Sequence, residues 1–505
     1  MSTITGLTSN AMLQAQMLVQ MQQQLNNLSQ QLSTGKQAQT YAGLGIQRGL
    51  DVNVRGTLSR LSAYQNSITT VSTNVQLQNT ALNSLNQMTQ DLRTATLQPI
   101  EFTLVARGQT NTQIEAGSDL DQALSVLNTQ AGNTYLFSGR ATNTPATDTA
   151  DHILNGNGTA AGLKQVISER LQADQGSDGR GRLQQPTAAG DVVTLTEDSE
   201  DPSHPFGFQI AGASTSIAGA TVTGPSGSPP SLSIDFGGTN PPDGSTVQIQ
   251  FTLPDGTSSS ISLTASSAVP TPAGSFAIGA TAADTATNLA NAIDSQIQTL
   301  AKTDLAAASA VQASNEFFNI DASHPPLRVN GPPFDSATGL RNATATDTVR
   351  WYTGDDATDD PRSTMSARVD DSITVNYGIR ANEEAIRNSV QNFATFAAMT
   401  FPASDPTAQD RYNALAARVG DNLAPSTTKQ QISAIQTEIA GANDAANAAK
   451  TRIDDKTPIL QGVLDNIENA DPNSVGAQLL TLQTQMSASL QTTAMLAKLS
   501  LVNFM

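Results

Sequence analysis

The stretch LVQMQQQLNNLSQQL (Leu18–Leu32) carries the pattern that decides the fold. Its apolar residues recur at alternating intervals of three and four, which is the spacing of one face of an α-helix packed on another helix. They are Leu18, Met21, Leu25, Leu28 and Leu32. The opposite face consists of polar, uncharged residues, and no charged side chain precedes Lys36. Because burying an unpaired charge is costly, this composition favours a helix that is covered on more than one side.

The C-terminal end of the chain has the same character. Between Asp471 and Met505 only Lys498 is charged. The apolar positions of this stretch are Leu479, Leu482, Met486, Leu490, Leu496 and Leu501. Periodicity alone would indicate an intramolecular core, but the missing charge at both ends favours burial between subunits. We therefore predict that the two stripes together form an assembly interface.

Two further helical stripes lie inside these ends. The first comprises Leu61, Ile68, Val71, Val75, Leu82 and Leu85, and the second comprises Ile432, Ile435, Ile439 and Ile453. We predict that they form the intramolecular seam of long rods, in which N-terminal helices pair with C-terminal helices. Pro458 is expected to kink or interrupt the second rod, since proline removes a helical hydrogen bond.

The middle of the chain is rich in Gly, Pro, Ser, Thr and Asp, and helical periodicity fades from about residue 140. Alternating segments predict strands, and LPDGT (Leu253–Thr257) predicts a hairpin turn. One helix is expected at Thr281–Ala301. A short strand is expected at Thr134–Arg140. The predicted strands of the insert are Val192–Leu195, Phe206–Ile210, Ser231–Phe236, Val247–Leu253 and Ser260–Leu263.

The predicted fold class is α+β, with elongated, nested coiled-coil rods formed by both chain ends and a β-rich central insert. The expected organisation is an assembly helix at 1–40 paired with one at 470–505, rod halves at 41–178 and 346–469, and a variable insert at 179–345. Hydrophobic residues make up 38% of the 505 residues, which is thin for one large core and favours such a layered molecule.

Composition also excludes several functions. The net charge of −18 works against binding to nucleic acid or an anionic membrane surface. There is no cysteine, so disulfides and thiolate chemistry are excluded. No apolar run approaches the roughly 18–20 residues of a membrane span, and the N-terminus lacks the features of a cleaved secretory signal. We therefore expect no membrane insertion.

No catalytic or metal-binding motif is found in the sequence. His152, His204 and His324 each lie alone in a loop-like context, which predicts surface histidines rather than metal ligands. Four aspartates lack the spacing of a calcium loop, and a solvated acidic loop is the expected structure. They are Asp355, Asp356, Asp359 and Asp360. We expect no enzymatic activity, no cofactor and no metal.

Both ends of the chain resemble the bacterial flagellin family, which includes the flagellar hook–filament junction protein. LSQQLSTGKQAQTYAGLGI (Leu28–Ile46) is similar to the family's leucine–serine–serine–glycine segment followed by an alanine–glycine–leucine turn, and AMLAKLSLVNFM (Ala494–Met505) resembles its apolar C-terminus. The resemblance covers roughly residues 1–140 and 365–505. TYLFSGRATNTP (Thr134–Pro145) is closer to the junction protein, whereas the length of the insert is ordinary for a filament subunit.

The resemblance implies a subunit that polymerises with itself into a helical tube for swimming motility. In the family, the terminal helices line a central channel, helical rods form the next shell and the insert faces solvent. It also implies an extracellular, flagellar location after export through the type III apparatus, with hook-associated proteins, cap proteins and a secretion chaperone as further partners. The alternatives are the hook–filament junction protein and, from the insert, a filament-displayed adhesin.

Overall fold

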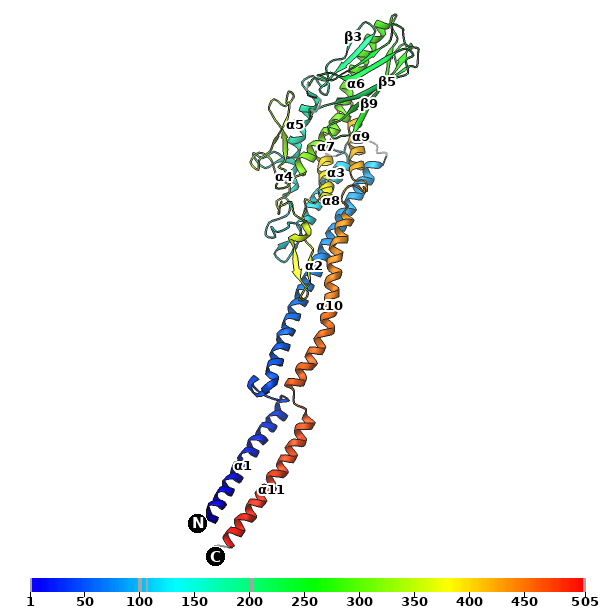
Figure 1. Ribbon diagram of the computed structural model, residues 1–505. Helices are drawn as coiled ribbons and strands as arrows, with labels where there is room; N and C mark the ends of the chain where they lie inside the picture. Colours follow the sequence, from blue (N-terminus) through cyan, green and yellow to red (C-terminus); the bar gives the residue numbers. More distant parts are fainter. Residues whose placement is uncertain (1, 99–101, 106–107, 200, 202–203, 503–505) are drawn as a thin grey trace. The chain divides into compact units, whose positions relative to one another are not determined.

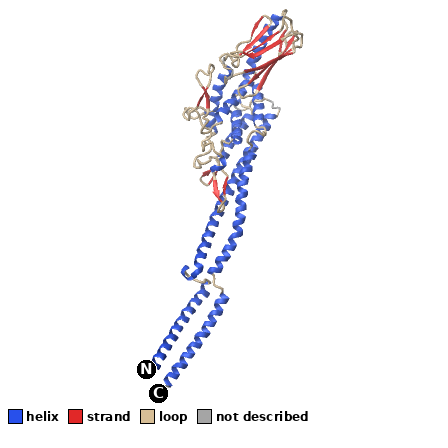
Figure 2. Ribbon diagram, in the orientation of Figure 1, coloured by secondary structure: helices blue, strands red, loops and turns tan. Residues whose placement is uncertain are grey.

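The computed structural model describes residues 2–98, 102–105, 108–199, 201 and 204–502, and it describes no side chains for residues 2–11, 496, 497 and 499–502. Helices account for 52% of the chain and strands for 16%, so the fold class is α+β with long helices at both ends (Figure 2). The chain folds into two compact units. The first contains residues 1–71, 367–375 and 444–505, and the second contains residues 72–366 and 376–443.

The helices in chain order are α1 (Ser2–Thr34), η1 (Tyr41–Gln47), α2 (Arg48–Leu97), α3 (Asn111–Leu127), α4 (Ala150–Asn155), α5 (Leu163–Gln175), α6 (Ala282–Lys302), α7 (Asp304–Phe318), η3 (Pro361–Thr364), α8 (Glu384–Ala398), α9 (Ala408–Asn422), α10 (Ile432–Glu468) and α11 (Pro472–Val502). The strands are β1 (Gln130–Ala131), β2 (Thr134–Tyr135), β3 (Thr187–Ala189), β4 (Val192–Thr196), β5 (Gln209–Thr215), β6 (Thr221–Ser226), β7 (Ser231–Asp235), β8 (Thr246–Thr252), β9 (Ser258–Ser266), β10 (Ser275–Ala277), β11 (Leu327–Val329), β12 (Leu340–Asn342), β13 (Ser366–Arg368) and β14 (Thr374–Asn376).

The first unit is built from two helix pairs. Helix α1 packs beside α11, and the two lie antiparallel (Figure 1). The first turns of α2 lie beside the last turns of α10, where Arg55 pairs with Glu468 and Gln65 donates to Asp454. Since the partner's number falls as the α2 number rises, this second pair is antiparallel as well.

The termini of α1 and α11 follow from local chemistry. Gly35 has φ 69° and its N–H donates to the carbonyl of Gln31, so it ends α1 in the left-handed conformation that glycine adopts easily. Asp471 accepts from the N–H of Asn473 and caps the start of α11.

In the second unit, two four-stranded sheets share a hydrophobic core with α6 and α7. The sheet orders are β3-β4-β7-β6 and β10-β9-β8-β5. All neighbouring strands pair antiparallel except β9 and β10, which are parallel. Buried and more exposed residues alternate along β4, β7 and β8, so each strand turns one face to the core. The largest side chains of this core are Phe208, Phe236, Phe251 and Phe276.

Several predicted elements are confirmed. Helix α6 begins after Thr281, whose side chain forms a reciprocal capping box with Asp284. The LPDGT turn joins β8 to β9 as an antiparallel hairpin, with Gly256 at φ 80°. Five insert strands occur where alternation predicts them, although β5 begins at Gln209 instead of Phe206.

Other predictions are wrong. Helices α5 and α7 lie in regions where no helix was predicted. The strand predicted at Thr134–Arg140 is limited to the two residues of β2, because Phe137 and Ser138 turn into the interior. Of the two effects predicted for Pro458, the interruption does not occur, because α10 continues through this residue. Burial of Ile453 and Ile467 on either side of the proline stabilises the helix despite the lost hydrogen bond.

Candidate functional site

The predicted assembly stripe of α1 lies partly against α11. Leu18, Met21, Leu25 and Leu28 are half-buried, whereas Leu32 is exposed. On α11, the predicted residues Leu479 and Met486 are half-buried, Leu482 is buried and Leu490 is exposed. The side chains of Leu496 and Leu501 lie outside the described part of the structure. The stripes therefore face each other, but the pair leaves most of both helices uncovered.

A second set of apolar side chains in this unit faces solvent. On α1 and α11 it includes Met17 and Leu480, which are 60% and 65% exposed. Further exposed members, from the helices and from the segment after Gly35, are Met12, Leu13, Val19, Tyr41, Ile46, Leu50, Val52, Ile459 and Met495. Among the side chains described in the second unit, large exposed apolar groups are confined to Leu97, Val105, Ile114 and Val269. Exposed apolar surface is therefore concentrated in the first unit.

The predicted rod seam has a different environment. All of its residues are buried, namely Leu61, Ile68, Val71, Val75, Leu82, Leu85, Ile432, Ile435, Ile439 and Ile453. Hydrogen bonds connect the same helices across the seam, for example from Gln436 to Asn83 in the second unit. The comparable stripes of α1 and α11 are less buried, so their apolar side chains could still pack against another molecule.

The junction between the two helix pairs of the first unit carries charge. The N–H of Ala470 donates to the carbonyl of Gly35 at 2.8 Å, which ties the connector after α1 to the one before α11. Next to it, Asp51 is buried 3.5 Å from Arg55, and Arg55 also pairs with Glu468. Burial, followed by the neighbouring Glu468, raises the pKa of Asp51. Charged residues, which are absent from α1 and limited to Lys498 on α11, are therefore present at this junction.

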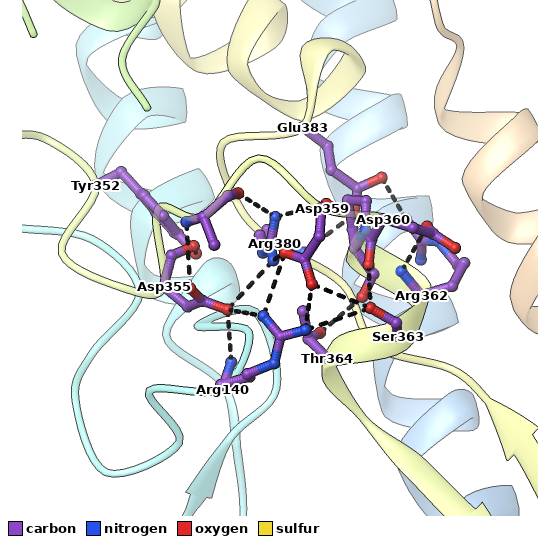
Figure 3. A network of polar contacts seen from close by, with 12 residues as sticks. Arg140, Tyr352, Asp355, Asp359, Asp360, Arg362, Ser363, Thr364, Arg380 and Glu383 are labelled. Atoms are coloured by element: carbon purple, nitrogen blue, oxygen red, sulfur yellow. Dashed lines mark hydrogen bonds and ion pairs between the residues drawn. The ribbon is translucent and has the colours of Figure 1, made fainter. Parts of the chain in front are cut away.

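The acidic segment 355–360 is a loop in which Asp359 and Asp360 are exposed, as predicted, but ion pairs that the sequence does not indicate also hold it in place. Figure 3 shows Asp355 and Asp359 between two guanidinium groups, those of Arg140 and Arg380. Arg380 is 3% exposed and also donates to the carbonyl of Asp359 at 2.9 Å. Hydrogen bonds from Arg140 and then Arg380 lower the pKa of Asp359. This cluster joins the TYLFSGR segment to the residues before α8 and is a structural contact.

One histidine prediction is also wrong. His204 is buried, and its Nε2 lies 2.9 Å from a carboxylate oxygen of Glu197. Burial opposes the charged imidazolium, but Glu197 outweighs it, so the pKa of His204 is raised. His324 is exposed and His152 is partly exposed, each beside an aspartate.

Neither a metal centre nor a membrane span is found among the described residues. Across the described residues, no group of three or more His, Asp or Glu side chains is arranged to hold a metal ion. Within the same ranges, no helix is both long and apolar enough to cross a membrane. The chain matches no known family model, and it matches no curated protein. The uncovered surfaces of α1 and α11 are therefore the candidate functional site.

Proposed function

We propose that this chain is a structural subunit of the bacterial flagellar filament and that it polymerises with copies of itself. The observation that carries the proposal is the concentration of exposed apolar side chains on two helices that lack charge almost completely. Covering such surfaces with other copies releases free energy at about 25 cal/mol per Å² of apolar area. The resemblance of Leu28–Ile46 and Ala494–Met505 to the flagellin family supports the same function.

The proposed architecture of the polymer is nested. Helices α1 and α11 form the inner layer, the paired α2 and α10 form coiled-coil rods around it, and the β-rich insert faces solvent. Contacts between subunits are heterologous and do not close, which produces a helical tube. The proposed location is the extracellular flagellum, after export by the type III apparatus. Cap proteins, hook-associated proteins and a secretion chaperone are the proposed further partners.

Removing residues 480–505 tests the proposal. We expect the truncated chain to stay monomeric at concentrations where the full chain polymerises, because it lacks most of α11. Electron microscopy and sedimentation measure the polymer, and circular dichroism checks that the second unit stays folded. Filaments formed in normal yield by the truncated chain would contradict the proposal.

The hook–filament junction protein is the second candidate, favoured by the segment Thr134–Pro145. The two candidates differ in where the protein is found. Labelled antibody along the whole filament would support the filament subunit, and a single spot where filament meets hook would support the junction protein. Both candidates use the same uncovered helices, so the truncation tests assembly and the antibody tests the position in the flagellum.

A further inference from the structure

A polar cavity of about 430 Å³ lies in the second unit, between α2, α8 and the segment that leads from α9 into α10. This volume is within the range of small-molecule sites in proteins. No aromatic ring lines it, and most of the lining side chains are amides, hydroxyls or cations. The residues on which the argument depends are Asn86, Gln90, Arg93, Glu384, Arg387 and Lys429.

Two partly buried arginines in this cavity lack the carboxylate partners that the fully buried arginines of this chain have. Arg170, Arg328 and Arg380 are buried and form ion pairs at 4 Å or less. Arg93 makes no ion pair among the described residues, and its Nε is buried without a hydrogen-bond acceptor. Arg387 has only a long contact of 3.4 Å with the carbonyl of Asn382. Carboxylates outnumber cations in this chain, which has a net charge of −18, and yet neither arginine has a carboxylate partner in the described part of the structure. Two such arginines at one cavity indicate a site for an anion.

The surroundings of the two arginines add to the positive potential. Lys429 supplies a third cation, and the lining residues include one carboxylate, Glu384, which accepts from the N–H of Gln430 at 3.2 Å. Burial lowers the pKa of Arg387, because Glu384 and Asp321 offset only part of the cost of burying its charge. The first turns of α8 and α10 both belong to the wall, and helix N-termini carry partial positive charge.

We propose that this cavity binds a small organic anion that also carries hydroxyl groups, such as an acidic sugar or a sugar phosphate. Arg93, Arg387 and Lys429 bind the carboxylate or phosphate. The amides of Asn86 and Gln90 can donate to or accept from hydroxyl groups, and neither has a side-chain hydrogen bond to another described residue. Recognition without an aromatic ring depends on hydrogen bonds, which suits a solute rich in oxygen. The inference does not depend on the proposed assembly function.

Isothermal titration calorimetry at low salt tests this inference on the full chain at concentrations where it stays monomeric. The probes are glucuronate, glucose 6-phosphate, inorganic phosphate and glucose. We expect at least one of the two sugar anions to bind at least ten times more tightly than glucose and inorganic phosphate. Binding of glucuronate alone assigns a carboxylate site, binding of glucose 6-phosphate alone assigns a phosphate site, and binding of both assigns the shared chemistry.

Substitutions then locate the site. Arg93→Gln and Arg387→Gln should each weaken binding by about tenfold or more, as expected for loss of a charged hydrogen bond. Arg350→Gln is the matched control, because Arg350 pairs with Asp356 away from the cavity. If either cavity variant fails to fold, the exposed Lys429→Gln replaces it. Absence of binding by both sugar anions, equal binding of glucose or inorganic phosphate, or an equal loss in Arg350→Gln would overturn the inference.

Discussion

Replacing two exposed apolar residues with glutamate, Met17→Glu together with Leu480→Glu, should prevent polymerisation without unfolding the subunit. Full burial of a Met or Leu side chain contributes about 1.5–3 kcal/mol. Since these two side chains remain 60% and 65% exposed in the monomer, about 1.5 kcal/mol each is still available on assembly. Together they account for about 3 kcal/mol, or roughly a hundredfold rise in the critical concentration. Burying two carboxylates adds to this loss.

The critical concentration is measured by sedimentation of the polymer over a series of subunit concentrations. Val269→Glu is the matched control, because Val269 is 95% exposed in the second unit, between β9 and β10. We expect this variant to polymerise like the original chain. All variants should have the same circular dichroism spectrum, since the replaced side chains contribute little to the folded subunit. The reasoning would be refuted by a double variant with an unchanged critical concentration, or by an equal effect of Val269→Glu.

Two predictions concern stability. Burial, with Glu115 and Asp91 nearby, raises the pKa of Asp119 to about 6. The protonated carboxyl group therefore makes its full contribution to the free energy of unfolding below about pH 4, and this contribution is lost as the pH rises through 6. Asp119→Asn should therefore raise the free energy of unfolding by about 1 kcal/mol at pH 7, after allowance for solvent screening, and leave it unchanged at pH 3.5; an equal gain at both values would contradict this. Arg380→Ala should lower the free energy of unfolding by about 2 kcal/mol, because it removes a buried guanidinium that pairs with Asp355 and donates to the carbonyl of Asp359. Arg350→Ala at an exposed pair should cost less than about 1 kcal/mol in the same denaturant titration.

The features that sequence predicted correctly are those set by neighbouring residues. The capping box of Thr281 and Asp284 and the turn at Gly256 each depend on a few consecutive residues, so both can be read directly. Helix α5 was missed because Glu169, Arg170 and Asp174 occupy its core-facing positions. These charged residues form ion pairs inside the protein, such as Arg170 with Asp174 at 2.9 Å. In the sequence they interrupt the apolar periodicity by which a helix is recognised.

The sites that sequence missed are assembled from distant segments. Arg140 and Asp355 are 215 residues apart, and nothing near either one indicates the other. The anion cavity has the same origin, since Arg93 lies on α2 and Arg387 on α8. For His204, the local sequence indicates a loop, and only the fold brings Glu197 within hydrogen-bonding distance. A local pattern predicts which residues need partners, but the chain's long-range pairing decides which partners they obtain.

The two helix pairs of the first unit differ in where their charged residues lie, which bears on the proposed assembly. If α1 and α11 only needed to fold against each other, charged residues on their outer faces would improve solubility at no cost to the contact between them. Helices α2 and α10 have such charges, for example Arg60 and Lys450, although their apolar stripes are buried. The two helix pairs of this unit thus differ in the number of charged residues on their outer faces, and the change occurs at the junction where Ala470 donates to Gly35. Because the uncharged outer faces contribute nothing to the fold of one chain, their composition supports the proposed covering by other copies.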